Sequence, residues 1–163
     1  MTRIRSIATI ATLGAAAAFF VAGPYMVYRG FDARDQVSAQ LRAEHITTPE
    51  DASRPNVAVV DGPTAMVQAD IIRKHALEST GGKAYAQMDR EDPARQVAFN
   101  ASALRGALMS SALAWEVANL VIGLGALVTF LGFILLAVGL VIRKPEELLI
   151  TAAPESLREP VVR

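Results

Sequence analysis

The sequence contains no cysteine, only two histidines and a single tryptophan. Without cysteine, this chain has no disulfide, no thiolate ligand for a metal and no cysteine nucleophile. Its 16 basic residues are balanced by 16 acidic residues, whereas nucleic-acid binding normally needs an excess of basic residues on one face. No phosphate-binding loop, nucleophile elbow or zinc-protease motif is found either. These observations argue against a nucleic-acid binder, and the commonest enzyme motifs are absent from the sequence.

Apolar residues, by contrast, make up 52% of the chain, and they are concentrated in two uncharged runs. One run extends from Ser6 to Tyr28 and the other from Val117 to Ile142. As helices they would be roughly 34 and 39 Å long, which exceeds the bilayer hydrocarbon thickness of about 30 Å. The second run is apolar on all sides, and a protein this small has no core large enough to bury it. The sequence therefore predicts two transmembrane helices, at 6–28 and 117–142.

The first run has a second interpretation, because basic residues followed by an apolar stretch also describe a signal peptide. The nearest stretch of small residues suited to cleavage is Val21-Ala22-Gly23, and Pro24 directly after it disfavours a cut. The run is also longer than the usual apolar region of a signal peptide, which has about 7 to 15 residues. The sequence favours an uncleaved helix.

Basic residues beside the two runs predict their orientation. Arg3 and Arg5 precede the first run, and Arg143 and Lys144 follow the second. Under the positive-inside rule, both termini are expected in the cytoplasm, which describes a multi-pass protein of the cell (inner) membrane. The expected segments are a cytoplasmic N-terminus at 1–5, an extracytoplasmic helical domain at 29–116 and a cytoplasmic tail at 143–163.

Aromatic residues mark the expected outer ends of both runs. Tyr25 and Tyr28 end the first run, and Trp115 precedes the second. Amphipathic rings favour the headgroup region, because the ring is apolar and its polar atom remains hydrated. The three positions are consistent with one helical hairpin.

Small residues recur along one face of each run. Helices in lipid associate by close approach at small residues, because lipid supplies no hydrophobic drive between them. The alanines of the first run are spaced by three and four residues, and the small residues of the second by seven, which suits a left-handed crossing. The predicted helix-packing positions are Ala8, Ala11, Ala15, Ala18 and Ala22 in the first helix and Ala118, Gly125, Gly132 and Gly139 in the second. They indicate an antiparallel hairpin or a homo-oligomer contact, although alanine is abundant enough for a chance pattern.

The start of the segment between the runs is the least determined part. Residues 31–44 extend the apolar pattern of the first helix. Thr47 to Glu50 resembles a capping box, which predicts a short helix starting near Pro49. Residues 57–60 fit either a strand or a docked loop, so the fold of 44–63 stays open.

The later part of this segment contains clearer signals. Asp61-Gly62-Pro63 predicts a turn followed by a helix over 64–79, and Gly81-Gly82 ends that helix. Asp92 directly before Pro93 predicts the start of another helix. No proline follows before residue 142, so this helix is expected to continue into the second run.

Few residues suit metal chemistry. His45, His75 and Glu78 are the only candidates, and His75 and Glu78 would share one helical face at i, i+3. A surface hydrogen bond is the more usual role of such a pair. The sequence accordingly predicts no catalytic residue, no bound cofactor and no metal site.

Two stretches carry a resemblance to a known group. Glu44 to Ala52 reads EHITTPEDA, and Asp61 to Pro93 reads DGPTAMVQADIIRKHALESTGGKAYAQMDREDP. With the two flanking runs, they resemble actinobacterial two-span membrane proteins commonly labelled "aromatic ring-opening dioxygenase LigA". Through its label, the resemblance implies an alternative function as a subunit or remnant of such a dioxygenase, with non-haem iron as cofactor. It carries over no catalytic residue.

The resulting expectation is a mainly α protein, a membrane helical hairpin with a small helical extracytoplasmic domain. The main functional hypothesis is a non-enzymatic interaction or assembly protein that acts through this domain. Its expected partners are the lipid bilayer and either a second copy of the chain or another membrane protein, with no nucleic acid.

Overall fold

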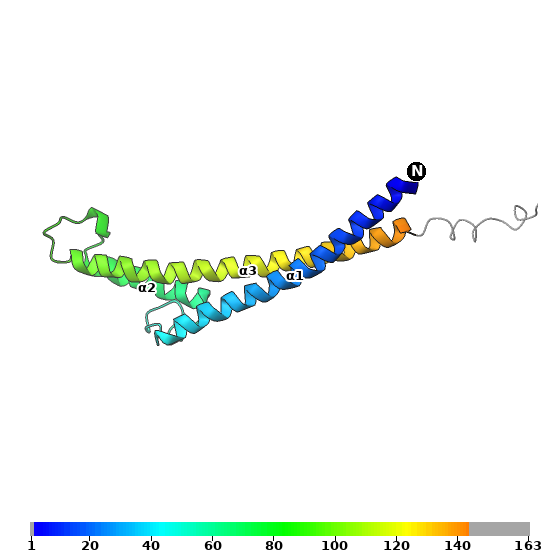
Figure 1. Cartoon of the computed structure of the whole chain (residues 1–163). Coiled ribbons are helices and arrows are strands. Elements are labelled where there is room, and N and C mark those ends of the chain that lie inside the picture. Colours follow the sequence, from blue (N-terminus) through cyan, green and yellow to red (C-terminus); the bar gives the residue numbers. More distant parts are fainter. Residues whose placement is uncertain (1, 144–163) are drawn as a thin grey trace, which may run out of the picture. The chain divides into compact units, whose positions relative to one another are not determined.

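The computed structural model describes residues 2–143, and this part of the chain is mainly helical (Figure 1). Its elements are α1 (Thr2–Ala43), α2 (Gly62–Ser79), the short 3-10 helix η1 (Tyr85–Gln87) and α3 (Arg95–Arg143). Within 2–143 there is no strand, and an isolated bridge pairs Thr47 with Ala58. The predicted mainly α fold with two long apolar helices is confirmed. The tail expected from 144 onward lies outside the described residues.

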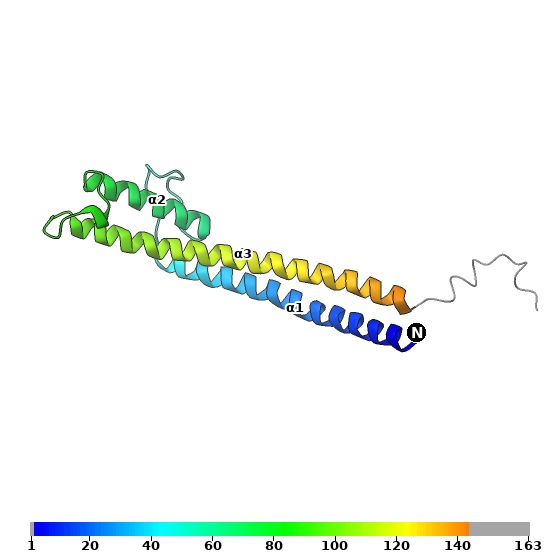
Figure 2. The same ribbon diagram turned by 90° about the horizontal axis from the view of Figure 1, so that it is seen from above.

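The chain divides into two compact units, which are described separately. The first, called here the terminal helix pair, contains the described residues 2–26 and 124–143. It consists of the first part of α1 and the last part of α3, which run side by side in both views of the ribbon (Figures 1 and 2). The second, called here the central unit, contains residues 27–123 and therefore holds α2 and η1.

Both long helices extend beyond their uncharged runs, as the sequence predicts. α1 continues to Ala43, which confirms the expected extension over 31–43. Pro24 lies inside α1, where it cannot donate the usual backbone hydrogen bond. α3 begins at Arg95, two residues after the start expected at Pro93, and it is continuous to Arg143. The Asp92 carboxylate accepts a hydrogen bond from the Ala94 amide at 2.9 Å.

α2 forms where its capping signals predict it, with its start at Gly62 instead of Thr64. The Asp61 carboxylate accepts a hydrogen bond from the Thr64 amide at 2.8 Å, and the Thr64 hydroxyl accepts one from the Asp61 amide at 3.1 Å. This reciprocal capping box satisfies amide groups that the first helical turn leaves without partners. At the other end, Gly81 and Gly82 adopt φ of +60° and +85°, a backbone region that glycine enters without steric cost.

The prediction of a short helix near Pro49 is wrong. Residues 44–61 form a loop instead, in which Thr48 is buried with 1% of its surface exposed. Its hydroxyl accepts a hydrogen bond from the Val57 amide at 3.0 Å and donates to the Arg54 carbonyl. The Thr48 hydroxyl thus bonds to residues six and nine positions later in the loop. It therefore does not cap a helix that starts near Pro49. Residues 57–60 are a docked loop, and Val59 is buried at 1% exposure.

A small apolar core holds α2 against the two long helices in the central unit. Four of its six members are alanine or valine, so the elements approach closely. The buried cluster consists of Leu41, Val59, Ala65, Ala69, Leu108 and Ala112. α1, the 44–61 loop, α2 and α3 each contribute at least one member. The core is therefore built from segments far apart in the sequence.

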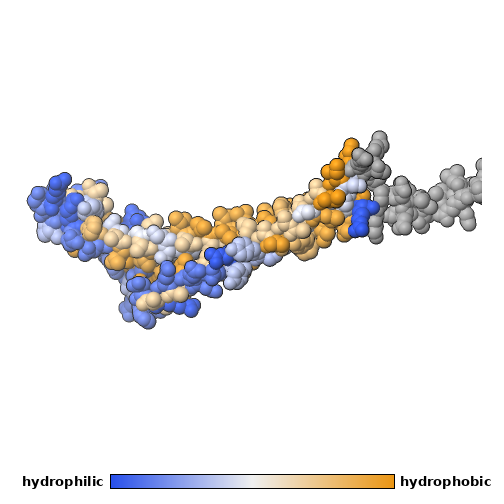
Figure 3. Space-filling model, in the orientation of Figure 1, coloured by the Kyte–Doolittle hydropathy of each residue, from blue (hydrophilic) through white to orange (hydrophobic). Residues whose placement is uncertain are grey.

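Hydropathy differs between the helices and the loops on the face drawn in Figure 3. Hydrophobic residues predominate over α1 and α3 in the terminal helix pair. In the central unit, hydrophilic residues gather over the two loops that precede and follow α2.

Candidate functional site

The closest contact of the terminal helix pair is at Gly23. A Cβ atom placed on Gly23 would lie 2.7 Å from the Thr129 amide nitrogen and 2.8 Å from the Gly125 carbonyl oxygen. Both distances are too short for real atoms, and both involve backbone that cannot rotate away. The backbones of α1 and α3 therefore touch at this point, and only glycine fits on α1.

Two further glycines of α3 pack against α1 in the same unit. Gly132 faces Ala16 and Phe19, and Gly139 faces Leu13. Residue numbers fall along α1 as they rise along α3, so the two helices are antiparallel. Next to this contact, the rings of Phe20 and Phe133 meet edge to face, with centroids 4.7 Å apart. Such a pair adds attraction beyond simple burial.

A similar contact occurs in the central unit. A Cβ atom on Gly30 would lie 2.5 Å from Cγ1 of Ile122 and 3.0 Å from the Ala118 carbonyl oxygen. Ala118 itself has 2% of its surface exposed. Here too, the small residue allows α1 and α3 to approach closely.

The predicted packing positions are buried on α3 but not on α1. On α3, Ala118, Gly125, Gly132 and Gly139 are all buried. On α1, Ala8 and Ala15 are half-buried, whereas Ala11, Ala18 and Ala22 are exposed. The contact on α1 is made instead by Ala16, Gly23 and Gly30, all of which are buried. The face of α1 that meets α3 is thus rotated away from the alanine stripe.

The sequence does contain a signal for these three residues. Ala16, Gly23 and Gly30 are spaced by seven, the same period as the small residues on α3. Two helices that cross with a left-handed supercoil repeat their contacts every seven residues. The contact residues of α1 are therefore indicated by the spacing of seven that they share with α3. The face of α1 that is richest in alanine does not indicate them.

The aromatic residues at the expected outer ends have different surroundings. Tyr25 and Tyr28 are 62% and 65% exposed. Trp115, in contrast, packs inside the central unit. The Arg34 guanidinium carbon lies 4.3 Å from the Trp115 ring centroid, and the ring fills the space that a side chain on Gly62 would occupy. Trp115 thereby joins α1, α2 and α3.

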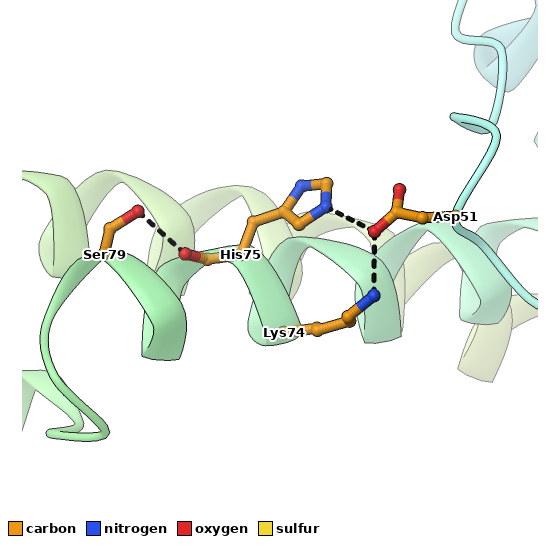
Figure 4. Close-up of polar contacts among 4 residues, drawn as sticks. All are labelled: Asp51, Lys74, His75 and Ser79. Atoms are coloured by element: carbon orange, nitrogen blue, oxygen red, sulfur yellow. Dashed lines mark hydrogen bonds and ion pairs between the residues drawn. The ribbon is translucent and has the colours of Figure 1, made fainter.

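A polar cluster in the central unit connects the 44–61 loop to α2 (Figure 4). Oδ2 of Asp51 accepts a hydrogen bond from Nζ of Lys74 at 2.8 Å and lies 2.9 Å from Nε2 of His75. The Ser79 hydroxyl donates to the His75 carbonyl at 2.8 Å. All these side chains are exposed, so water and salt weaken the ion pairs. The pKa of Asp51 is lowered from its ordinary 3.8 to about 2. The hydrogen bond from Lys74 is the largest cause, and the hydrogen bond with His75 is the second.

The weak metal candidates of the sequence do not form a metal site. Within residues 2–143, no group of three or more histidine, aspartate or glutamate side chains is arranged to hold a metal ion. His75 bonds to Asp51, and His45 lies in the turn after α1 with its side chain exposed. Glu78 is exposed on α2.

Gly23→Ala tests the backbone contact. The added methyl group has no space, so we expect the free energy of unfolding to fall by about 1–3 kcal/mol, the usual cost of overpacking. Gly14→Ala is the matched control, because a Cβ atom at Gly14 meets nothing within 4 Å. There we expect a gain of about 0.5–1 kcal/mol from the better helix propensity of alanine. Unfolding in mixed detergent followed by circular dichroism measures both, and equal effects would contradict the contact.

The Asp51 cluster predicts a dependence of stability on pH. Since the pKa of Asp51 is lower in the folded state, the cluster stabilises the fold fully above about pH 4. This contribution is lost as the pH falls from about 4 towards 2. The pKa of Lys74 is raised by the same bond, so the contribution is also lost when the pH rises above 10.5 and Lys74 deprotonates. Thermal melts of the wild type and Asp51→Asn should differ at pH 6 and converge near pH 2; a constant difference would disprove the linkage.

Two helices of the described chain are long and apolar enough to cross a membrane. They are Ser6–Ala43 and Arg95–Arg143, and only 11% of the most apolar part of each is buried. Length and composition alone support this property. Comparisons with models of protein families, with curated proteins and with solved structures found no match for this chain.

Proposed function

We propose that the chain is a two-pass membrane protein and that its central unit mediates interaction or assembly outside the cytoplasm. The observation that carries this proposal is the exposure of the apolar helices, because only 11% of the most apolar part of each is buried. The core helix of a soluble protein would be mostly buried. Lipid is the solvent that covers such surfaces without a free-energy penalty.

The dimensions of the terminal helix pair support a bilayer around it. Residues 124–143 of α3 are about 30 Å long, which equals the usual hydrocarbon thickness. The antiparallel contact at Gly23 joins the helices through backbone and small residues, the mode of association that works in lipid. Tyr25, exposed at 62%, would lie at the headgroup level. The positive-inside rule then places both termini in the cytoplasm of the cell membrane.

An interaction role for the central unit is supported by apolar side chains that it leaves exposed on α3. The exposed large residues before the second uncharged run are Val97, Phe99, Leu104, Met109 and Leu113. Leu113 is 66% exposed, and soluble surfaces rarely retain such groups unless a partner covers them. Within residues 2–143, no group of three or more histidine, aspartate or glutamate side chains is arranged to hold a metal ion. A second copy of the chain or another membrane protein is therefore the proposed partner.

The orientation is tested by cysteine labelling, for which the cysteine-free sequence provides a clean background. Ser53 is exposed in the 44–61 loop, so Ser53→Cys should react with a membrane-impermeant maleimide in intact cells. A cysteine appended after Arg163 should react only after permeabilisation. Both proteins should stay in the membrane fraction during alkaline carbonate extraction. Labelling of both positions in intact cells, or extraction into the soluble fraction, would refute the two-pass arrangement.

The interaction role is tested by site-specific photocrosslinking in native membranes. A photoreactive amino acid in place of Leu113 should yield a discrete larger adduct, because a partner is expected to cover this residue. Glu78 is the matched control, since it is an exposed polar residue of the same unit and lies on α2, outside the exposed apolar residues of α3. Mass spectrometry of the adduct distinguishes a second copy from another protein. Monomer alone at Leu113, or equal adducts at both positions, would contradict the proposal.

A further inference from the structure

We propose that the central unit contains a binding site for a small oxyanion, a phosphate or carboxylate group attached to a compact apolar body. The site is a cavity of about 160 Å³ between the second half of α2, the segment at 83–85 and the start of α3. Three cationic side chains line it, namely Arg73 from α2, Lys83 from the segment after it and Arg105 from α3. No carboxylate belongs to its lining.

The three cations have no acidic partner in the part of the chain that the structure describes. The ion pairs found there join Arg29 to Asp32 and Asp51 to both Lys74 and His75. Arg73, Lys83 and Arg105 take part in none of them. Three like charges around one cavity repel each other, and an anion between them would remove this repulsion.

Arg105 supplies the most specific observation. Its Nε atom is buried without a hydrogen-bond partner, and an unpaired buried donor on a charged group is costly. The guanidinium group carries its donors in a planar fork that fits carboxylate and phosphate oxygens. An oxyanion held by the other nitrogens of the guanidinium group would offset the charge of this buried donor. Gln68 Oε1 is the other buried atom without a partner, and Gln68 does not line the cavity.

The local fold positions the Lys83 backbone and weakens the repulsion between an anion and the C-terminal end of α2. The carbonyl groups of Ala76 and Leu77 would present negative charge to the cavity. They are already bonded, because the Thr80 amide donates to both and the Gly82 amide donates to Leu77 at 2.7 Å. The Thr80 hydroxyl donates to the Lys83 carbonyl at 2.6 Å, which holds Lys83 at the edge of the cavity.

The remaining lining determines what the oxyanion would be attached to. Alanines from both helices and the Tyr85 ring form an apolar wall. The Tyr85 ring is itself held by the Arg95 guanidinium carbon, 4.3 Å from the ring centroid, and by Phe99. The Ser102 hydroxyl adds one polar group. A small aromatic or aliphatic phosphate or carboxylate therefore fits the lining better than a bare ion.

The position of the cavity favours a soluble anion over a lipid headgroup. Arg105 precedes Val117, the first residue of the second uncharged run, by about 18 Å of helix. If α3 crosses the membrane as proposed above, a lipid of the same bilayer would have to extend well beyond its headgroup layer to reach the cavity. The existence of the oxyanion site itself does not depend on the membrane proposal.

Isothermal titration calorimetry on the detergent-solubilised full chain tests the site, with phenyl phosphate and inorganic phosphate as probes. Phenyl phosphate should bind, and inorganic phosphate should bind more weakly because it leaves the apolar wall uncovered. Arg105→Gln should weaken phenyl phosphate binding at least tenfold, since charge-assisted hydrogen bonds of this kind are the strong ones. Lys83→Gln should act in the same direction. Arg54→Gln is the matched control, because Arg54 is exposed in the 44–61 loop and lies outside the cavity, and it should leave the affinity unchanged.

Circular dichroism of each variant separates loss of binding from loss of folding. Absence of phenyl phosphate binding to the folded wild type at 10 mM, or equal affinity in Arg105→Gln and Arg54→Gln, would overturn the proposal. A second titration uses the chain in nanodiscs of phosphatidylcholine with or without phosphatidylglycerol. Unchanged binding in both supports a soluble ligand. Competition by phosphatidylglycerol that Arg105→Gln abolishes would keep the oxyanion site but assign it to a lipid headgroup.

Discussion

The direct backbone contact between α1 and α3 is the constraint on which the rest of the structure depends. In the terminal helix pair it occurs at Gly23, and in the central unit at Gly30. Close approach brings many atoms into van der Waals range, and this attraction needs no water to drive it. A side chain at either glycine would force the helices apart, and the packing of Phe20 on Phe133 would change with them.

The central unit adds polar and aromatic connections to this helical pair. α2 contributes mainly alanine to the core, so apolar burial alone is small. Trp115 adds contacts with Arg34 of α1 and with the start of α2. Asp51 connects the 44–61 loop to Lys74 and His75 of α2. The buried Thr48 hydroxyl closes that loop on itself. Several exposed or short-range interactions thus take the place of a large hydrophobic core.

The cavity around Arg105 differs from these connections, because its charged groups have no partners within the described chain. Elsewhere in the central unit, the charges of Asp51 and Lys74 satisfy each other. The cavity is distinguished by its lining, in which three cationic side chains occur without a carboxylate, and by the buried guanidinium nitrogen of Arg105 that has no partner.

The sequence by itself determined the two apolar runs, the end of α2 and, to within two residues, the starts of α2 and α3, because length, capping and glycine signals act over a few neighbouring residues. It did not determine which face of α1 meets α3, since alanine stripes occur on more than one side of the helix. Tertiary structure decided that Ala16, Gly23 and Gly30 form the contact. It also decided that Thr48 bonds across its loop instead of capping a helix, and that Arg73, Lys83 and Arg105 share one cavity. Those outcomes depend on contacts between distant segments. The seven-residue spacing of Ala16, Gly23 and Gly30 indicates the contact face only when it is compared with the matching spacing on α3, and the local sequence does not indicate the other two outcomes.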